Sequence, residues 1–186
     1  DDTITTGAGA DTIFGGVGVD GIMAGDGRNV VFGDHGTITR DTATGSIVAT
    51  STFESTGGVD TITTGIDSDL IFGGAAGDII ISGAGSDYVF GDAGTATFAS
   101  NLPVTLSTTA PDTGGDDNIQ SGTEADVVLG GDGVDTINAG DGQNVVFGDY
   151  GTVTWTGTLL ATATATAQGT GGSDDITTGV DLQEVD

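Results

Sequence analysis

Thirteen side chains with oxygen atoms that could bind a metal ion occupy one position of a short repeated motif. The chain contains tandem nine-residue units, such as TGAGADTIF (6–14) and GGVGVDGIM (15–23), and their sixth residue is almost always Asp. A carboxylate that recurs at a fixed interval predicts many equivalent cation sites rather than one catalytic centre. The sixth-position residues are Asp2, Asp11, Asp20, Asn29, Asp60, Asp69, Asp78, Asp87, Asp117, Asp126, Asp135, Asn144 and Asp174.

The composition favours calcium as the cation. Ca²⁺ binds about six to eight oxygen atoms in irregular geometry, and carboxylates and main-chain carbonyls supply such atoms. One His and no Cys offer few ligands to zinc, copper or iron, and Mg²⁺ holds its water too firmly for an all-protein cage. Lys and Arg number 2 against 28 Asp and Glu, so about thirteen divalent cations would balance the net charge of −26. We therefore expect multiple bound Ca²⁺ ions.

Several units depart from the pattern, which predicts sites of unequal strength. Asn29 and Asn144 offer an oxygen atom without a charge, so their sites should be weaker. Asp67, Ala76 and Glu124 replace the usual fourth-position Gly, so we expect these loops to bend differently. Asp67 and Glu124 could also be extra ligands.

A second acidic motif, Gly-Asp-x-Gly-Thr, occurs at 33–37, 91–95 and 148–152. Its acids lie outside the sixth-position register. They could bind a terminal ion, or they could accept hydrogen bonds within the turn as Asp commonly does, and the sequence leaves both alternatives open. These acids are Asp34, Asp92 and Asp149.

The eighth position of each unit is Ile or Val, as in Ile13, Ile22 and Val31. Side chains alternate along a strand, so the sixth and eighth positions lie on the same side of it. Gly pairs supply the positive φ angles of tight turns, and frequent Gly with β-branched residues disfavours helix throughout. Each unit is therefore expected to be a short strand plus a turn. Two units should form a coil of 18 residues, with the eighth-position residues stacked in an internal aliphatic ladder.

A longer repeat is superposed on the units, because Asp-x-Ile begins at Asp2, Asp60, Asp117 and Asp174, spaced by 58, 57 and 57 residues. Each long repeat ends in an insertion that is rich in Thr, Val and Ala and predicts strands or a loose hairpin. The insertion could form one widened coil or a protruding hairpin. The predicted division is repeat 1 at 1–59 with insertion 37–59, repeat 2 at 60–116 with insertion 95–116, repeat 3 at 117–173 with insertion 152–173, and the start of repeat 4 at 174–186.

Apolar residues recur at the seventh and ninth positions, which should face outward. Because their phase also repeats, we expect them to be covered by the insertion or by a neighbouring chain. They include Phe14, Phe32, Leu70, Phe72, Phe90, Val127, Leu129 and Phe147.

The tandem GGxGxDx(hydrophobic)x pattern resembles the repeats-in-toxin (RTX) calcium-binding repeats of secreted bacterial proteins. The resemblance covers roughly two thirds of the chain, outside the insertions, and implies a right-handed parallel β-roll or β-solenoid. It further implies that Ca²⁺ lies between the turns of neighbouring coils, held by sixth-position carboxylates and by carbonyls of the Gly-rich loops. The implied stacked pairs are Asp2/Asp20, Asp11/Asn29, Asp60/Asp78, Asp69/Asp87, Asp117/Asp135 and Asp126/Asn144.

Other functional classes fit the sequence poorly. The strong negative charge disfavours nucleic acid and anionic membranes as partners, and no run approaches the length of apolar residues needed for membrane insertion. No Gly-x-Ser-x-Gly elbow is present, and no Ser–His–Asp set can be built in each repeat. We therefore expect no enzymatic activity in this segment.

The expected role is structural: a calcium-stabilised repeat segment of a large secreted bacterial surface protein, such as an adhesin, a surface-layer protein or an extracellular filament component. Calcium outside the cell would convert an acidic, unfolded chain into a stiff rod. Identical chains could associate laterally or end to end. Two alternatives remain, namely an ice- or glycan-binding module that uses Thr-x-Thr rows such as Thr95/Thr97, and the calcium-folded export tail of a secreted enzyme.

Overall fold

The computed structural model describes residues 1–52, 57–109, 114–166 and 171–179. Within these ranges the chain forms nineteen strands, and none of it forms a helix that could cross a membrane. The predicted all-β fold is confirmed. Four segments that the sequence analysis assigned to insertions or to repeat 4 lie outside the described residues: 53–56, 110–113, 167–170 and 180–186.

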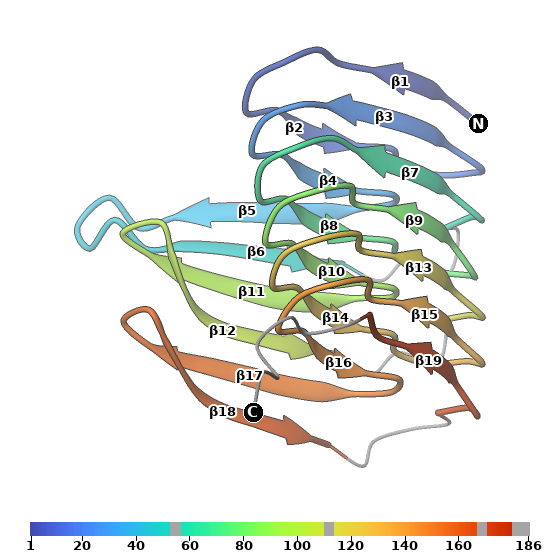
Figure 1. The fold of residues 1–186 in the computed structure, drawn as a ribbon. Helices are drawn as coiled ribbons and strands as arrows, with labels where there is room; N and C mark the ends of the chain where they lie inside the picture. Colours follow the sequence, from blue (N-terminus) through green and yellow to red (C-terminus); the bar gives the residue numbers. More distant parts are fainter. Residues whose placement is uncertain (53–56, 110–113, 167–170, 180–186) are drawn as a thin grey trace.

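The nine-residue units form a roll of two parallel sheets (Figure 1). Successive units alternate between the sheets, so strands stack on partners one coil away. Sheet A has the order β1-β3-β7-β9-β13-β15-β19 and sheet B the order β16-β14-β10-β8-β4-β2. In sheet A the strands are β1 (Thr3–Thr5), β3 (Gly21–Gly25), β7 (Thr61–Thr64), β9 (Ile79–Ile81), β13 (Asn118–Gln120), β15 (Thr136–Asn138) and β19 (Asp175–Thr177). In sheet B they are β2 (Thr12–Phe14), β4 (Val30–Phe32), β8 (Leu70–Phe72), β10 (Tyr88–Phe90), β14 (Val127–Leu129) and β16 (Val145–Phe147).

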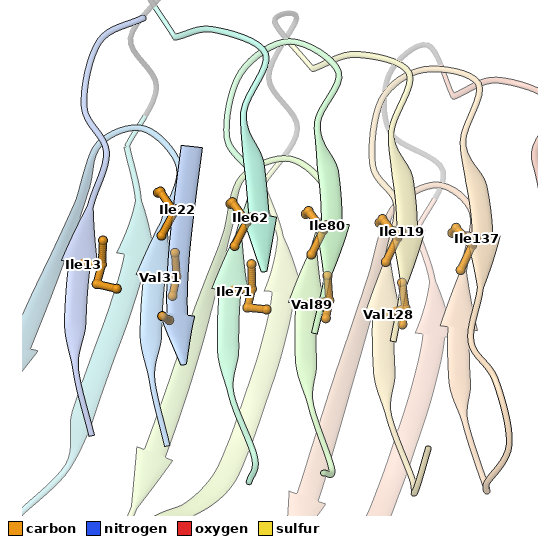
Figure 2. Packing of buried hydrophobic residues seen from close by; sticks show 11 residues of the cluster. Ile13, Ile22, Val31, Ile62, Ile71, Ile80, Val89, Ile119, Val128 and Ile137 are labelled. Carbon is orange, nitrogen blue, oxygen red and sulfur yellow. The ribbon is translucent and has the colours of Figure 1, made fainter. Parts of the chain in front are cut away.

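The eighth-position residues form the predicted aliphatic ladder between the two sheets (Figure 2). Ile22, Ile62 and Ile80 come from sheet A and face Val31, Ile71 and Val89 from sheet B, and each is at most 1% exposed. The register is in phase from coil to coil, as in the pairing of Ile62 with Ile80. One branched aliphatic side chain per unit therefore fills the narrow interior.

The insertions are protruding hairpins rather than widened coils. They are formed by β5 (Gly36–Arg40) with β6 (Ile47–Ser51), β11 (Gly94–Ala99) with β12 (Leu102–Thr108), and β17 (Gly151–Thr156) with β18 (Leu159–Ala165). The three hairpins pair with one another in one antiparallel sheet, which we call the hairpin sheet. The roll is continuous past each insertion: β3 pairs with β7 and β9 with β13, in the same register as coils without one except for an irregularity between Met23 and Gly25.

The hairpin sheet covers the outward face of sheet B. Phe32, Phe72 and Phe90 stack with ring centroids 4.6–4.8 Å apart and are fully buried against residues such as Leu106 and Val153. Covering by the insertion, one of the two predicted alternatives, is therefore what the structure shows. Phe14, at the end of the stack, is 42% exposed.

This packing explains the second Gly of the Gly-Asp-x-Gly-Thr motif. A Cβ at Gly36 would collide with the ring of Phe32, and the same holds for Gly94 with Phe90. Only Gly lets the first strand of each hairpin approach the aromatic row so closely. In contrast, the outward face of sheet A carries mainly Thr, Asn and Gln, with Met23, Ile79 and Ile81 also exposed, and no layer formed by the described residues covers it (Figure 1).

Candidate calcium-binding turns

The sixth-position residues form two rows, one along each line of turns. The insertion-side row lies in the turns that lead from sheet B to sheet A, where the hairpins are inserted; the opposite row lies in the turns that lead from sheet A to sheet B. The insertion-side row is Asp2, Asp20, Asp60, Asp78, Asp117, Asp135 and Asp174, and the opposite row is Asp11, Asn29, Asp69, Asp87, Asp126 and Asn144.

All six stacked pairs implied by the resemblance are adjacent in the structure. In each pair, the backbone N–H of one sixth-position residue donates to Oδ1 of its neighbour, as from Asp60 to Asp78 at 2.7 Å and from Asp69 to Asp87 at 2.8 Å. The other four bonds measure 2.6–3.0 Å. Five further pairs bridge the insertions, which the sequence analysis did not foresee: Asp20/Asp60, Asn29/Asp69, Asp78/Asp117, Asp87/Asp126 and Asp135/Asp174.

The second carboxylate oxygen of these Asp residues is buried without a hydrogen-bond partner among the described residues. This holds for Oδ2 of Asp20, Asp60, Asp69, Asp78, Asp87, Asp117, Asp126 and Asp135. Buried carboxylate oxygens are strongly disfavoured unless a proton or a cation compensates them. Eight such atoms in two regular rows fit a series of cations.

Main-chain carbonyls converge on the same places. A Cβ at Gly33 would collide with both Oδ2 of Asp60 and the carbonyl oxygen of Gly73, and a Cβ at Gly73 with Oδ2 of Asp78 and the carbonyl of Gly91. The first-position glycines thus leave room for carboxylate and carbonyl oxygens, the donor set that Ca²⁺ prefers. Among the described residues, no three His, Cys, Asp or Glu side chains form a metal-binding group. The residues present therefore fit calcium held by carboxylates and backbone together.

Burial raises the pKa of the carboxyl groups in the insertion-side row. It raises the pKa of Asp60 and Asp135 to about 7 and that of Asp78 to about 9, with neighbouring carboxylates adding to the effect. The pKa of Asp117 is raised well above its usual range by burial and by the charges of Asp92 and Asp78. Without a cation, ionisation of this row is therefore strongly disfavoured.

The opposite row is perturbed less. Burial raises the pKa of Asp69 and Asp126 to about 6 and that of Asp87 to about 7. Backbone N–H groups that donate to these carboxylates, and the nearby hydroxyls of Thr64, Ser121 and Ser82, oppose this shift.

The two Asn residues of the opposite row bond to their own turns. The Asn29 amide donates to the carbonyls of Gly25 and Gly27 at 3.1 and 2.7 Å, and the Asn144 amide to those of Ala139 and Gly140 at 2.9 and 3.2 Å. Each Oδ1 accepts the backbone N–H from the adjacent coil, as an Asp would. The amide nitrogen of each Asn thus already donates to two carbonyls of its own turn.

The acids of the Gly-Asp-x-Gly-Thr motif connect each hairpin base to the next coil. Asp34 accepts from the N–H of Gly58, where the chain returns from the hairpin, at 3.3 Å, and from that of Ala75, one coil further, at 2.7 Å. Asp92 accepts from Gly115 and Asp132 in the same way. Both oxygens of Asp34 and of Asp92 are thus hydrogen-bonded to backbone. Burial and the charge of Asp174 raise the pKa of Asp149, and a backbone hydrogen bond from Gly172 opposes this rise.

The non-glycine fourth-position residues keep a left-handed backbone but bend less than glycine. Asp67, Ala76 and Glu124 have φ of 68–81°, whereas the glycines at this position have φ of 103–139°. The expected difference in bending is therefore present, and it is modest. Glu124 accepts from the N–H of Gly85 at 3.0 Å, so its carboxylate supports the neighbouring turn.

Three acids that the sequence analysis did not single out also bond across coils. Asp1 accepts from Val19, Asp116 from Val134, and Asp26 from Ile66, all through backbone N–H groups. Asp1 and Asp116 both occupy the fifth position of their units, and this shared position could have indicated from the sequence that they have a common role.

The sequence matches the family description "RTX calcium-binding nonapeptide repeat (4 copies)" over residues 1–31, 54–89, 63–97 and 112–146, which together cover more than half of the chain. No curated protein and no solved structure matches it. Repeats of this family bind Ca²⁺ and are typical of secreted bacterial proteins. The two-sheet roll, the paired carboxylates and this match agree, and the chain belongs to the RTX calcium-binding nonapeptide repeat family.

Proposed function

We propose that the chain is a structural segment of a large secreted bacterial surface protein, such as an adhesin, a surface-layer protein or an extracellular filament, and that calcium bound along both rows of turns stiffens it. The main observation behind this proposal is the regular ladder of buried carboxylate oxygens that have no hydrogen-bond partner among the described residues. Calcium would compensate all of them at once. Extracellular calcium modules often bind with dissociation constants of about 10⁻⁴ to 10⁻³ M, so folding would follow export.

The arrangement of the hairpin sheet is consistent with a mechanical role for the segment. It runs across all three long repeats and packs on the aromatic row of sheet B, so each repeat is tied to the next by three sheets. We further propose that the segment is not an enzyme, because the same carboxylate environment recurs in each coil and its Oδ1 atoms already bond to the backbone.

The test is a far-UV circular dichroism titration with calcium from a chelated start, with magnesium as the control, followed by small-angle scattering. We expect a cooperative transition from coil to β structure near millimolar calcium and none with magnesium, together with an elongated calcium-bound particle. A chain that is fully β-structured in chelator at neutral pH would contradict the proposal.

A second candidate, a binding face for ice or for a glycan, is favoured by the outer surface of the hairpin sheet. Two columns of side chains cross all six of its strands, and every member is Thr or Ser except Val48. The first column is Thr37, Thr50, Thr95, Ser107, Thr152 and Thr164, and the second is Thr39, Val48, Thr97, Thr105, Thr154 and Thr162.

Cross-strand pairs within these columns are also expected for stability alone, since Thr50 and Thr95, Ser107 and Thr152, and Thr154 and Thr162 have hydroxyl oxygens 2.7–3.3 Å apart. Thermal hysteresis of the calcium-bound protein, compared with a Thr97→Lys/Thr105→Lys variant, separates the roles. Activity that the variant loses would support the ice-binding candidate. Absence of activity in the unmodified protein would leave the columns with a purely structural role.

A further inference from the structure

Both basic side chains of the chain line one cavity. The sequence contains only Arg28 and Arg40 against 28 acidic residues. Arg28 lies in a turn of the opposite row, immediately before Asn29, and Arg40 ends strand β5 near the tip of the first hairpin. Folding brings them to the same cavity of about 310 Å³, between the hairpin tips and the turns of the roll.

Neither guanidinium is neutralised within the described part of the chain. Both side chains are exposed, and no carboxylate of the described residues forms an ion pair with either. An Arg normally finds a carboxylate easily in so acidic a protein. Asp11 and Asp69 of the opposite row also line this cavity. When calcium compensates these two carboxylates, the two guanidiniums remain available to an external anion.

The floor of the cavity is aromatic and aliphatic. Tyr88 and Phe98 meet edge to face with centroids 5.8 Å apart, and Ile47 and Leu70 lie beside them. Arg28 and Tyr88 line the same cavity, and burial raises the pKa of Tyr88 while the charge of Arg28 opposes that rise. An apolar floor with a few charged groups at its edge is the usual composition of a ligand site.

A second cavity, without a basic residue in its lining, lies at the next repeat. This cavity of about 740 Å³ lies under the tip of the third hairpin, and Tyr88 lines both cavities. Its lining includes Trp155, which meets Tyr88 edge to face at 6.1 Å, with Gln143 and Thr158. Figure 1 shows the hairpin tips extending past the turns of the roll on this side. Because Tyr88 lines both cavities, an elongated ligand can extend from the first cavity to the second.

We propose that this groove binds an acidic saccharide, with a ring carboxylate held by Arg28 and Arg40 and further rings extending past Tyr88 towards Trp155. Aromatic rings match the apolar faces of sugar rings, and the amide and hydroxyl groups of Gln143 and Thr158 match their hydroxyl edges. A guanidinium pair selects a carboxylate by charge-assisted, bidentate hydrogen bonds. The site is distinct from the outer Thr columns and does not rest on the proposed structural role.

The test is isothermal titration calorimetry of the calcium-loaded protein with a short oligogalacturonate, a neutral galactose oligomer of equal length and a Glu-rich peptide, at constant free calcium. We expect binding of the uronate oligomer only. The variant Arg28→Gln/Arg40→Gln should weaken it by about tenfold or more. Gln already stands at the equivalent position of repeat 3, as Gln143, so the fold should accept Arg28→Gln.

The control is Thr5→Glu/Gln120→Glu, which makes the same change in net charge on the exposed face of sheet A, far from the groove. It should bind as the unmodified protein does. Absence of uronate binding, equal weakening by the control, or tighter binding of the peptide than of the uronate would each overturn the proposal. Circular dichroism of both variants in calcium establishes that they are folded.

Discussion

The two rows of turns are built from the same nine-residue unit, yet they differ in charge, in burial and in whether they hold the hairpins. The insertion-side row is Asp in each coil and also holds the hairpin bases through Asp34 and Asp92. The opposite row includes two Asn residues, and its units begin with Thr, Ser or Ala, whereas those of Asp20, Asp78 and Asp135 begin with Gly. Asp78 is buried near the carboxylates of Asp60 and Asp92, and burial together with these charges strongly disfavours its ionisation. The comparison indicates that the insertion-side row depends most on calcium, and that it controls attachment of the hairpin sheet.

The largest expected effect is a reversal of the pH dependence when calcium is removed. Burial raises the folded-state pKa of Asp78 to about 9, and of Asp69 in the opposite row to about 6, from an ordinary 3.8. Such groups stabilise the metal-free fold fully below about pH 4, and this stability is lost as the pH rises through the folded-state values. Circular dichroism of the metal-free chain should therefore show β structure in acid that disappears mainly between about pH 6 and pH 9.

With calcium bound, the dependence should run the other way, because the ligands must be deprotonated to hold the metal. The same pH series in saturating calcium is the control. A metal-free β signal that grows with rising pH would contradict the assignment of buried, uncompensated carboxylates to these rows.

Removal of a hairpin-base carboxylate should be the next largest effect. Asp92→Ala leaves the N–H groups of Gly115 and Asp132 without their acceptor, at a cost of about 1–3 kcal/mol for each one that stays buried. We expect the calcium-bound protein to lose ~2–4 kcal/mol of unfolding free energy in urea, with increased binding of a hydrophobic dye as the phenylalanine row is uncovered. Asp26→Ala, an exposed counterpart on the opposite side, should cost less than about 1 kcal/mol. Equal losses would remove the distinction between the two sides.

A matched pair of substitutions compares the rows directly. Asp78→Asn and Asp69→Asn each remove one ligand charge and keep the Oδ1 that accepts a backbone N–H from the adjacent coil, and Asn29 shows that the turn tolerates the change. Ligand charge sets calcium affinity. We therefore expect the calcium midpoint of folding to rise about tenfold for Asp78→Asn and about threefold for Asp69→Asn. A larger shift for Asp69→Asn would reverse the ranking of the rows.

The sequence predicted the roll well because its period is strict. Sixth-position Asp and eighth-position Ile or Val recur every nine residues, so the coil size, the aliphatic ladder and the stacked carboxylates followed from side-chain alternation alone. The insertions vary freely in sequence, so the choice between a coil and a hairpin had no local signal. That choice depends on contacts distant in sequence, such as Leu106 against the phenylalanine row. Likewise, no residue pattern showed that Arg28 and Arg40 would share a cavity.

The smallest expected effect tests how the Asn units work. In both of them the first residue is Ala, as in Ala24 and Ala139, whereas Asp units of the same row begin with Thr or Ser. The Asn29 amide already donates to the carbonyls of Gly25 and Gly27, so these carbonyls do not require a cation as a partner. Asn29→Asp replaces that donor by an oxygen and should add about one Ca²⁺ per chain, with a stability change below about 1 kcal/mol in calcium. Asn118→Asp, on the exposed face of sheet A, adds the same charge and should leave the calcium content unchanged. If equilibrium dialysis shows equal calcium content for Asn29→Asp and the unmodified protein, then Asn29 already holds a cation, and the two rows differ in affinity rather than in occupancy.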